Sequence, residues 1–280
     1  MKEILYGYSE LLIVAGLLVS LSVTVELGFL QGRRRQRAIS ESVRSQINGV
    51  LASTVGLLAL LLGFTFSLAV ERYEARNQAV VAETNAIGTT YLRTWLLPAD
   101  MQEDTRQLLR QYVDALIKEG AVPLADSTAR APLQNQATRI SNQIWAQAIK
   151  AAERDPRLLT SGLFIQTLND QIDATAARNA ELSRHVPEIV IWLILVASLF
   201  ATGLLGFASG ISGERASISA GILAVTLIIV IYLIITLDRP RSGPIRTNPQ
   251  PVTSLVQSMQ PEWAPIQPAG PSNAPKPPQE

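Results

Sequence analysis

Four windows of the sequence are almost free of charged residues, and each is about 20 residues long or longer. They cover residues 4–30, 47–70, 188–209 and 217–237. A helix needs about 20 predominantly apolar residues to cross the roughly 30 Å hydrocarbon core of a bilayer. The sequence therefore predicts a membrane protein with four transmembrane helices.

The spacing of the windows predicts two pairs of helices with a polar insert between them. We assign residues 1–30 and 47–70 to the first pair, and 188–209 and 217–237 to the second. A signal peptide is the alternative for the first window, but its apolar stretch is longer than usual and lacks a cleavage pattern. The basic loop 31–46 joins the first pair. The insert, residues 71–185, shows apolar residues at helical spacing and no convincing strand, so we predict an all-α fold with a helical extramembrane domain.

The segment after the fourth helix has the composition of a tail. Residues 238–280 hold 11 of the 16 prolines of the chain. From about residue 260 onward the apolar content is too low to form a core, which predicts disorder there.

The second apolar window continues into the insert without a helix stop. A set of positions spaced alternately three and four residues apart, here called the seam, runs through both parts. Its apolar half is Gly49, Ala52, Gly56, Ala59 and Gly63; it continues as Phe66, Val70, Tyr73, Asn77, Val80, Thr84, Ile87 and Tyr91. The unbroken spacing predicts one helix from residue 47 to about 95, of which residues 47–91 span roughly 65 Å at 1.5 Å per residue.

A helix of this length needs a partner along its seam. Small residues at such spacing let two helix backbones approach closely within lipid. The partner is either the helices of the insert or copies of the same helix around a symmetry axis. Arg72 and Arg76, one turn apart on a flank, are interpreted as a solvated interfacial face.

The third predicted span carries a second set of small residues, Gly203, Gly206 and Gly210. Close packing against another helix is the favoured interpretation, and a flexible hinge is the alternative.

Sequence signatures of an enzyme are missing. The sequence has no zinc-protease, nucleophile-elbow, P-loop or dinucleotide-binding pattern. We expect an interfacial or helix-end role for the single histidine, His185, and contact with water or an arginine for Glu26. Because the chain has no cysteine, disulfides and thiolate metal sites are excluded. We predict no catalytic residue, cofactor or metal site, and the net charge of +1 argues against nucleic acid as a partner.

Three segments carry a resemblance to a known family. The central run LLGFTFSLAVERYEARNQAVVAETNAIGTTYLRTWLLP, residues 61–98, is similar to the signature of the bacterial bestrophin-like domain family. The segments VELGFLQGRRR and LDRPRSGPIRTNPQPVTSLVQSM agree with it, so the resemblance covers about residues 20–260. That family is named for its relation to bestrophin anion channels.

The resemblance implies a pentameric anion channel whose second span lines the pore and runs on into a helical domain. Small anions, membrane lipid and further copies of the chain are then the expected partners. Five residues would face the pore axis and form its constriction: Gly63, Phe66, Val70, Tyr73 and Asn77. The glycines and alanines at positions 49, 52, 56 and 59 would pack helix against helix. The proline-rich loop and acidic cluster of the calcium clasp in animal bestrophins are missing, so calcium gating is not expected.

Two further expectations concern function and orientation. The alternative function is a non-conducting membrane sensor or scaffold whose helical domain binds a partner. We expect a multi-pass protein of the bacterial inner membrane. The five arginines of the loop 31–46 favour a cytoplasmic position for that loop.

Overall fold

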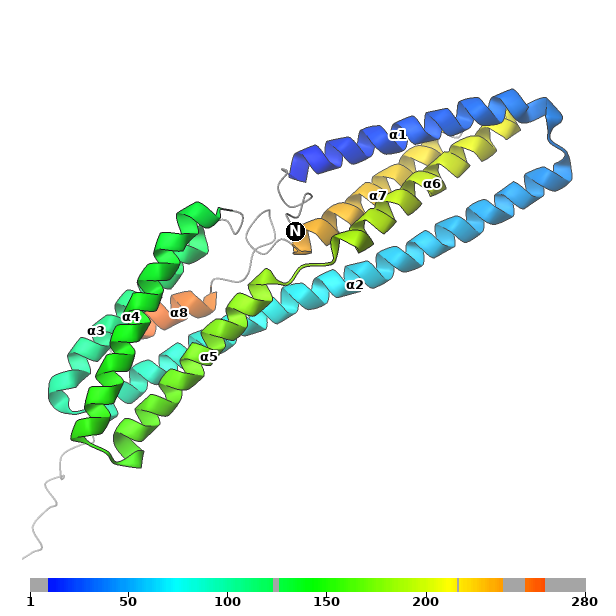
Figure 1. Cartoon of the computed structure of the whole chain (residues 1–280). Coiled ribbons are helices and arrows are strands. Elements are labelled where there is room, and N and C mark those ends of the chain that lie inside the picture. The colour runs from blue at the N-terminus through cyan, green and yellow to red at the C-terminus, as the bar shows by residue number, and fades with distance from the viewer. Residues whose placement is uncertain (1–9, 123–125, 216, 239–249, 260–280) are drawn as a thin grey trace, which may run out of the picture. The chain divides into compact units, whose positions relative to one another are not determined.

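The structure is a computed structural model that describes residues 10–122, 126–215, 217–238 and 250–259 (Figure 1). Over these residues the chain is helical, and no strand occurs among them. Four stretches, each containing a long apolar helix, are long and apolar enough to cross a membrane: Leu12–Ala38, Glu41–Leu96, Leu158–Ser212 and Ile218–Asp238. The predicted all-α fold with four transmembrane helices is therefore confirmed.

The chain divides into two compact units, which are described separately. The first comprises Met1–Val80, Gly120–Pro132 and Thr175–Asn248, and the second comprises Val81–Glu119, Leu133–Ala174 and Pro249–Glu280. Helix α2, Glu41–Arg93, contributes its first part to one unit and its last part to the other. With 53 residues it is about 80 Å long. The helix therefore continues past residue 70, as predicted.

The first unit contains the apolar helices. These are α1 (Glu10–Arg35), the first part of α2, α6 (Glu188–Ser212) and α7 (Ser217–Asp238). Leu21 of α1, Leu58 of α2 and Ile231 of α7 are among the most deeply buried members of its apolar core. All four predicted spans thus contribute side chains or backbone to one unit.

Helices α1 and α6 touch through glycines. A Cβ atom at Gly206 would overlap the carbonyl oxygen of Val25, and one at Gly210 would overlap that of Phe29. From the other helix, a Cβ atom at Gly28 would overlap the carbonyl oxygen of Gly203. Backbone approach at this distance is what small residues permit in lipid, where the hydrophobic effect gives helices no drive to associate.

The Gly206→Ala variant is expected to be less stable than the wild type by about 1–3 kcal/mol, because the added methyl group forces α1 and α6 apart. Gly221→Ala is the matched control, since a Cβ atom at Gly221 meets no atom of the described residues within 4 Å. Thermal unfolding in detergent, followed by tryptophan fluorescence, measures both. Equal midpoints for the two variants would contradict the close contact.

The two short connections of the first unit lie at the same end of its helices. Gly213 ends α6 in the left-handed region, at φ 81°, and a side chain there would collide with Gln36 of the first connection. Arg44 of α2 donates a hydrogen bond from Nη2 to the carbonyl oxygen of Ile211 at 3.2 Å. Both loops therefore lie on one side of the membrane, as two helical pairs require.

The second unit is a helical domain around one apolar core. It contains the end of α2, most of α3 (Ala99–Ala121) and α4 (Ser127–Arg154), the beginning of α5 (Leu163–Ser183), and α8 (Gln250–Ser258). Leu109, Ile144 and Leu168 are fully buried there, each on the apolar side of its helix. The insert thus consists largely of amphipathic helices that pack around a core of their own.

Helix α8 is held against the same core by Tyr91. The carbonyl oxygen of Met259, the residue directly after α8, accepts a hydrogen bond from the Tyr91 hydroxyl at 3.2 Å. Arg110 donates a hydrogen bond to the same hydroxyl at 3.0 Å. Arg110 also lies 2.5 Å from Glu103, and this hydrogen bond lowers the pKa of the Glu103 carboxyl below its ordinary value. Helix α8 lies in the segment that we interpreted only as a tail.

We expect Tyr91→Phe to lower the free energy of unfolding by roughly 1–2 kcal/mol, because it removes the bond to Met259 and leaves Arg110 with one acceptor fewer. Limited proteolysis of the tail would report the loosened α8 as faster cleavage. Unchanged cleavage would show that apolar contacts alone hold the helix.

Several helix ends differ from the predicted bounds. Helix α1 extends to Arg35 and α2 begins at Glu41, so the basic loop predicted for 31–46 is reduced to the few residues between them. The reason is that charged residues form helix as readily as apolar ones, so an apolar window marks the membrane rather than the helix. The expected start at residue 1 and the disorder expected from residue 260 lie outside the described residues.

Candidate functional site

The candidate site is the part of α2 that lies in the first unit, because two of its faces have different surroundings. One face is buried in the core of its own chain. It consists of Leu58, Leu62, Thr65, Ala69 and Arg76. These residues are spaced so that they follow one side of the helix, and Ala69 is completely inaccessible.

The seam lies on a second face, which the chain leaves uncovered over its apolar half. Gly49, Ala52, Gly56, Ala59, Gly63 and Phe66 are exposed. A Cβ atom placed at Gly49, Gly56 or Gly63 would meet no atom of another described segment within 4 Å. The next three seam residues, Val70, Tyr73 and Asn77, are half-buried.

The last seam residues have a different environment. Ile87 and Tyr91 are buried in the core of the second unit, and Thr84 is also buried. A sequence repeat of 3.5 residues drifts by about 20° per heptad on a straight α-helix. Over the six heptads from Gly49 to Tyr91 the drift reaches about 120°. The seam therefore winds around α2, and its two ends face different surroundings.

A buried ion pair anchors α2 where it passes the end of α7. Arg76 and Asp238 have side-chain exposures of 1% and 0%, with Nη2 and Oδ1 3.7 Å apart. Arg76 also donates from Nη1 to the carbonyl oxygen of Asp238 at 2.8 Å and from Nη2 to that of Leu237 at 3.2 Å. The arginine thus binds the last carbonyl groups of α7, which the helix itself cannot satisfy.

Asp238 connects the same cluster to the start of α6. Its Oδ1 accepts a hydrogen bond from the backbone N–H of Val186 at 3.0 Å, and Nδ1 of His185 lies 3.8 Å from its Oδ2. The sequence interpretation of Arg76 as solvated was wrong, whereas the expected helix-end position of His185 is what the structure gives. Arg76 lies seven residues after Ala69 and fourteen after Leu62, and this spacing was the available signal for burial.

The remaining predicted residues have clear positions. Gly203, Gly206 and Gly210 of α6 lie against α1, where Thr24 Cγ2 approaches a Cβ position at Gly203 to 3.0 Å. Glu26 binds Arg215 at 2.8 Å near the surface, as expected for a carboxylate that reaches an arginine. Among the described residues, no cluster of histidine and carboxylate side chains is suited to hold a metal ion.

These features can be compared with known proteins. A family model described as the Bestrophin-like domain matches residues 18–252. The chain belongs to the Bestrophin-like family. The resemblance seen in the central run is therefore confirmed over most of the chain. No curated protein sequence matches the chain significantly.

Solved structures show the same fold. A variant of a bacterial bestrophin homologue from Klebsiella pneumoniae has a TM-score of 0.66 at 15% identity, covering 90% of this chain and 97% of that chain. The structure of that homologue phased by Zn-SAD has a TM-score of 0.62 at 16% identity, with 88% and 95% covered. A crystal structure described as that of a membrane protein has a TM-score of 0.63 at 15% identity, with 90% and 98% covered. Nearly the whole length of each chain is thus shared.

Proposed function

We propose that the protein is an oligomeric anion channel whose pore is lined by α2 and its continuation outside the membrane. Membership of the Bestrophin-like family and the shared fold support a bestrophin-type channel in general. The observation that carries the finer proposal is the exposed half of the seam, Gly49 to Phe66, on a helix whose other face is buried in its own chain. By family resemblance the oligomer is a pentamer.

The side chains along the seam suit a pore with one narrow segment. Glycine and alanine at positions 56, 59 and 63 leave space beside the helix axis, whereas Phe66, Val70 and Tyr73 fill it. Hydrophobic constrictions of this kind can gate by dewetting. The buried anchor at Arg76 lies within three turns of Phe66 and holds the narrow segment in a fixed orientation.

Reconstitution tests the proposal. The purified protein should be a homo-oligomer by native mass spectrometry, and liposomes containing it should pass chloride or another small anion. Oligomers of verified size that conduct none of several anions would overturn the proposed function. A monomer in both detergent and lipid would remove the axial pore.

The alternative function, a non-conducting sensor or scaffold, requires that helices of the same chain fill the seam. The exposure of Gly49, Gly56 and Gly63 supports the channel instead. Phe66 is also 39% exposed, so the described residues of the chain leave part of its ring uncovered.

We also propose that the protein lies in the bacterial inner membrane with its arginine loop in the cytoplasm. The loop is short and basic, and such loops stay on the cytoplasmic side. Because the chain has no cysteine, single cysteines at Ser40 and Thr128 can be labelled selectively. In intact spheroplasts an impermeant thiol reagent should label Thr128→Cys and not Ser40→Cys. The reverse pattern would invert the orientation.

A further inference from the structure

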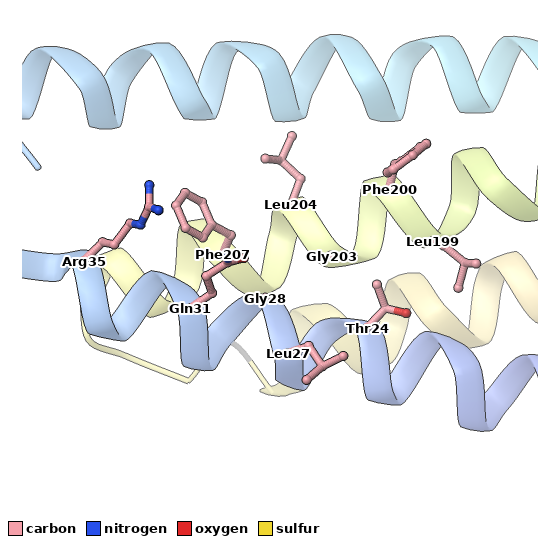
Figure 2. A pocket seen from close by; sticks show the side chains of 10 residues that line it. All are labelled: Thr24, Leu27, Gly28, Gln31, Arg35, Leu199, Phe200, Gly203, Leu204 and Phe207. Carbon is pink, nitrogen blue, oxygen red and sulfur yellow. The ribbon is translucent and has the colours of Figure 1, made fainter.

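A groove between α1 and α6 has no part in the proposed pore (Figure 2). Its volume is about 490 Å³. Gly28 and Gly203 form its floor, where the two backbones touch and no side chain fills the space. The groove therefore results directly from the glycine contact. The larger side chains on both sides form its walls, and the glycines at its floor have no side chain.

The charge in the lining of the groove lies at one end of α1, since Thr24 at the other end is neutral and its hydroxyl donates a hydrogen bond to the carbonyl oxygen of Ser20. Leu27 lies near one end, and Gln31 and Arg35 follow at intervals of about one helical turn toward the other end (Figure 2). From α6 the lining consists mainly of apolar side chains, among them Phe200, Leu204 and Phe207. The polar end coincides with the last turn of α1, where Arg33 and Arg34 accompany Arg35.

This arrangement matches an amphiphile that lies parallel to the helices. The apolar part of the groove is within the predicted membrane span, and Arg35 is at the boundary, where the headgroups of lipids are located. Basic pockets between transmembrane helices bind anionic headgroups, and arginine suits a phosphate because its guanidinium donates two parallel hydrogen bonds.

The charge of the groove distinguishes a lipid from a neighbouring helix as its occupant. The side chain of Arg35 forms no hydrogen bond or ion pair with any residue that the structure describes. Leu27 and Phe200 at the rim are 62% and 70% exposed, as expected for side chains that face acyl chains. An apolar helix of a second copy could fill the glycine floor but would leave the arginine without an anionic partner.

We propose that the α1–α6 groove binds one anionic phospholipid, with its phosphate on Arg35 and Gln31 and one acyl chain along the floor formed by Gly28 and Gly203. This inference does not depend on conduction. The bound lipid would cover the glycine contact and stabilise the pairing of α1 with α6.

Native mass spectrometry of the full chain tests the proposal. The protein is exchanged into detergent with phosphatidylglycerol or phosphatidylcholine of identical acyl chains. The wild type should retain one phosphatidylglycerol per chain in preference to phosphatidylcholine. Arg35→Gln should lose about fivefold of that preference, corresponding to about 1 kcal/mol for one arginine near an anionic surface.

Two further variants make the result specific. Arg34→Gln removes the same charge from the same turn but does not line the groove, so it should keep the preference. Leu204→Trp fills the apolar part and should reduce retention of both lipids. Equal retention of both lipids by the wild type, or equal losses in the two arginine variants, would overturn the site. Crosslinking of Phe200→Cys to a second copy would also overturn it, since a protein helix would then occupy the groove.

Discussion

Replacing Phe66 by alanine is expected to raise the chloride flux through reconstituted protein. The phenyl ring is the first large side chain of the seam after a run of glycine and alanine, and it is 39% exposed on the chain's own surface. Removing it widens the proposed constriction and makes it easier to wet. Lowering the barrier by about 1.4 kcal/mol would increase the flux about tenfold. Flux into liposomes, normalised to the number of oligomers, is the measurement.

Phe64 supplies a matched control, two residues away on a different side of α2. It is 67% exposed, but it does not belong to the seam, so Phe64→Ala should leave the flux unchanged. Equal increases in the two variants would indicate a general loosening of the helix. An unchanged flux in Phe66→Ala would place the constriction elsewhere.

Breaking the buried ion pair is expected to have the largest effect on stability. Asp238→Asn keeps the size of the side chain and an acceptor for the Val186 N–H, but it removes the negative charge that lies 3.7 Å from Arg76. Removing one partner of a buried pair typically costs about 3–5 kcal/mol. We expect Asp238→Asn and Arg76→Met to lose this amount, measured by thermal unfolding and by the yield of the oligomer in detergent.

The exposed pair of Glu26 and Arg215 is the control for this experiment. Its side chains are 48% and 61% accessible, so Glu26→Gln should cost less than about 1 kcal/mol. The double variant Arg76→Met/Asp238→Asn should be more stable than either single variant, because neither charge of the pair is then left buried and the amide oxygen still accepts from the Val186 N–H. An Asp238→Asn protein as stable as Glu26→Gln would show that the cluster does not anchor α2.

The sequence predicted the fold because its strongest signals are local. An apolar segment of this kind, long enough to cross the membrane, forms a helix in lipid, because its backbone N–H and C=O groups then form hydrogen bonds with one another. The absence of any proline or stop between Phe66 and Arg76 was sufficient to predict that α2 continues. Helix ends were less certain, because Arg33 and Glu41 form helix outside the apolar windows.

The partners of the small residues could not be predicted from spacing alone. Both α6 and the seam of α2 carry small residues three or four positions apart, yet Gly203, Gly206 and Gly210 contact α1, whereas a Cβ atom at Gly49, Gly56 or Gly63 meets no atom of another described segment within 4 Å. The missed signal was on α1, where Gly28 and Gly32 are four residues apart and complement α6. A sequence shows that a helix face carries small residues, but it does not show which other helix packs against that face.

The buried arginine shows a second limit. A charged residue beside an apolar run usually lies at the interface with its charge in water. Arg76 is buried because the chain returns to it 162 positions later with Asp238 and the last carbonyl groups of α7. Periodicity within α2 indicates the face on which the arginine lies, but the counterion is a property of the tertiary structure.

Charged thiol reagents applied to single-cysteine variants of α2 test the central claim most directly. The natural chain has no cysteine, so the unmodified protein is a blank. Modification of Gly63→Cys, Phe66→Cys and Val70→Cys should change the chloride flux, whereas Leu58→Cys and Leu62→Cys, buried in the same helix, should be unaffected. A flux that responds at neither set, or equally at both, would contradict a pore lined by the seam.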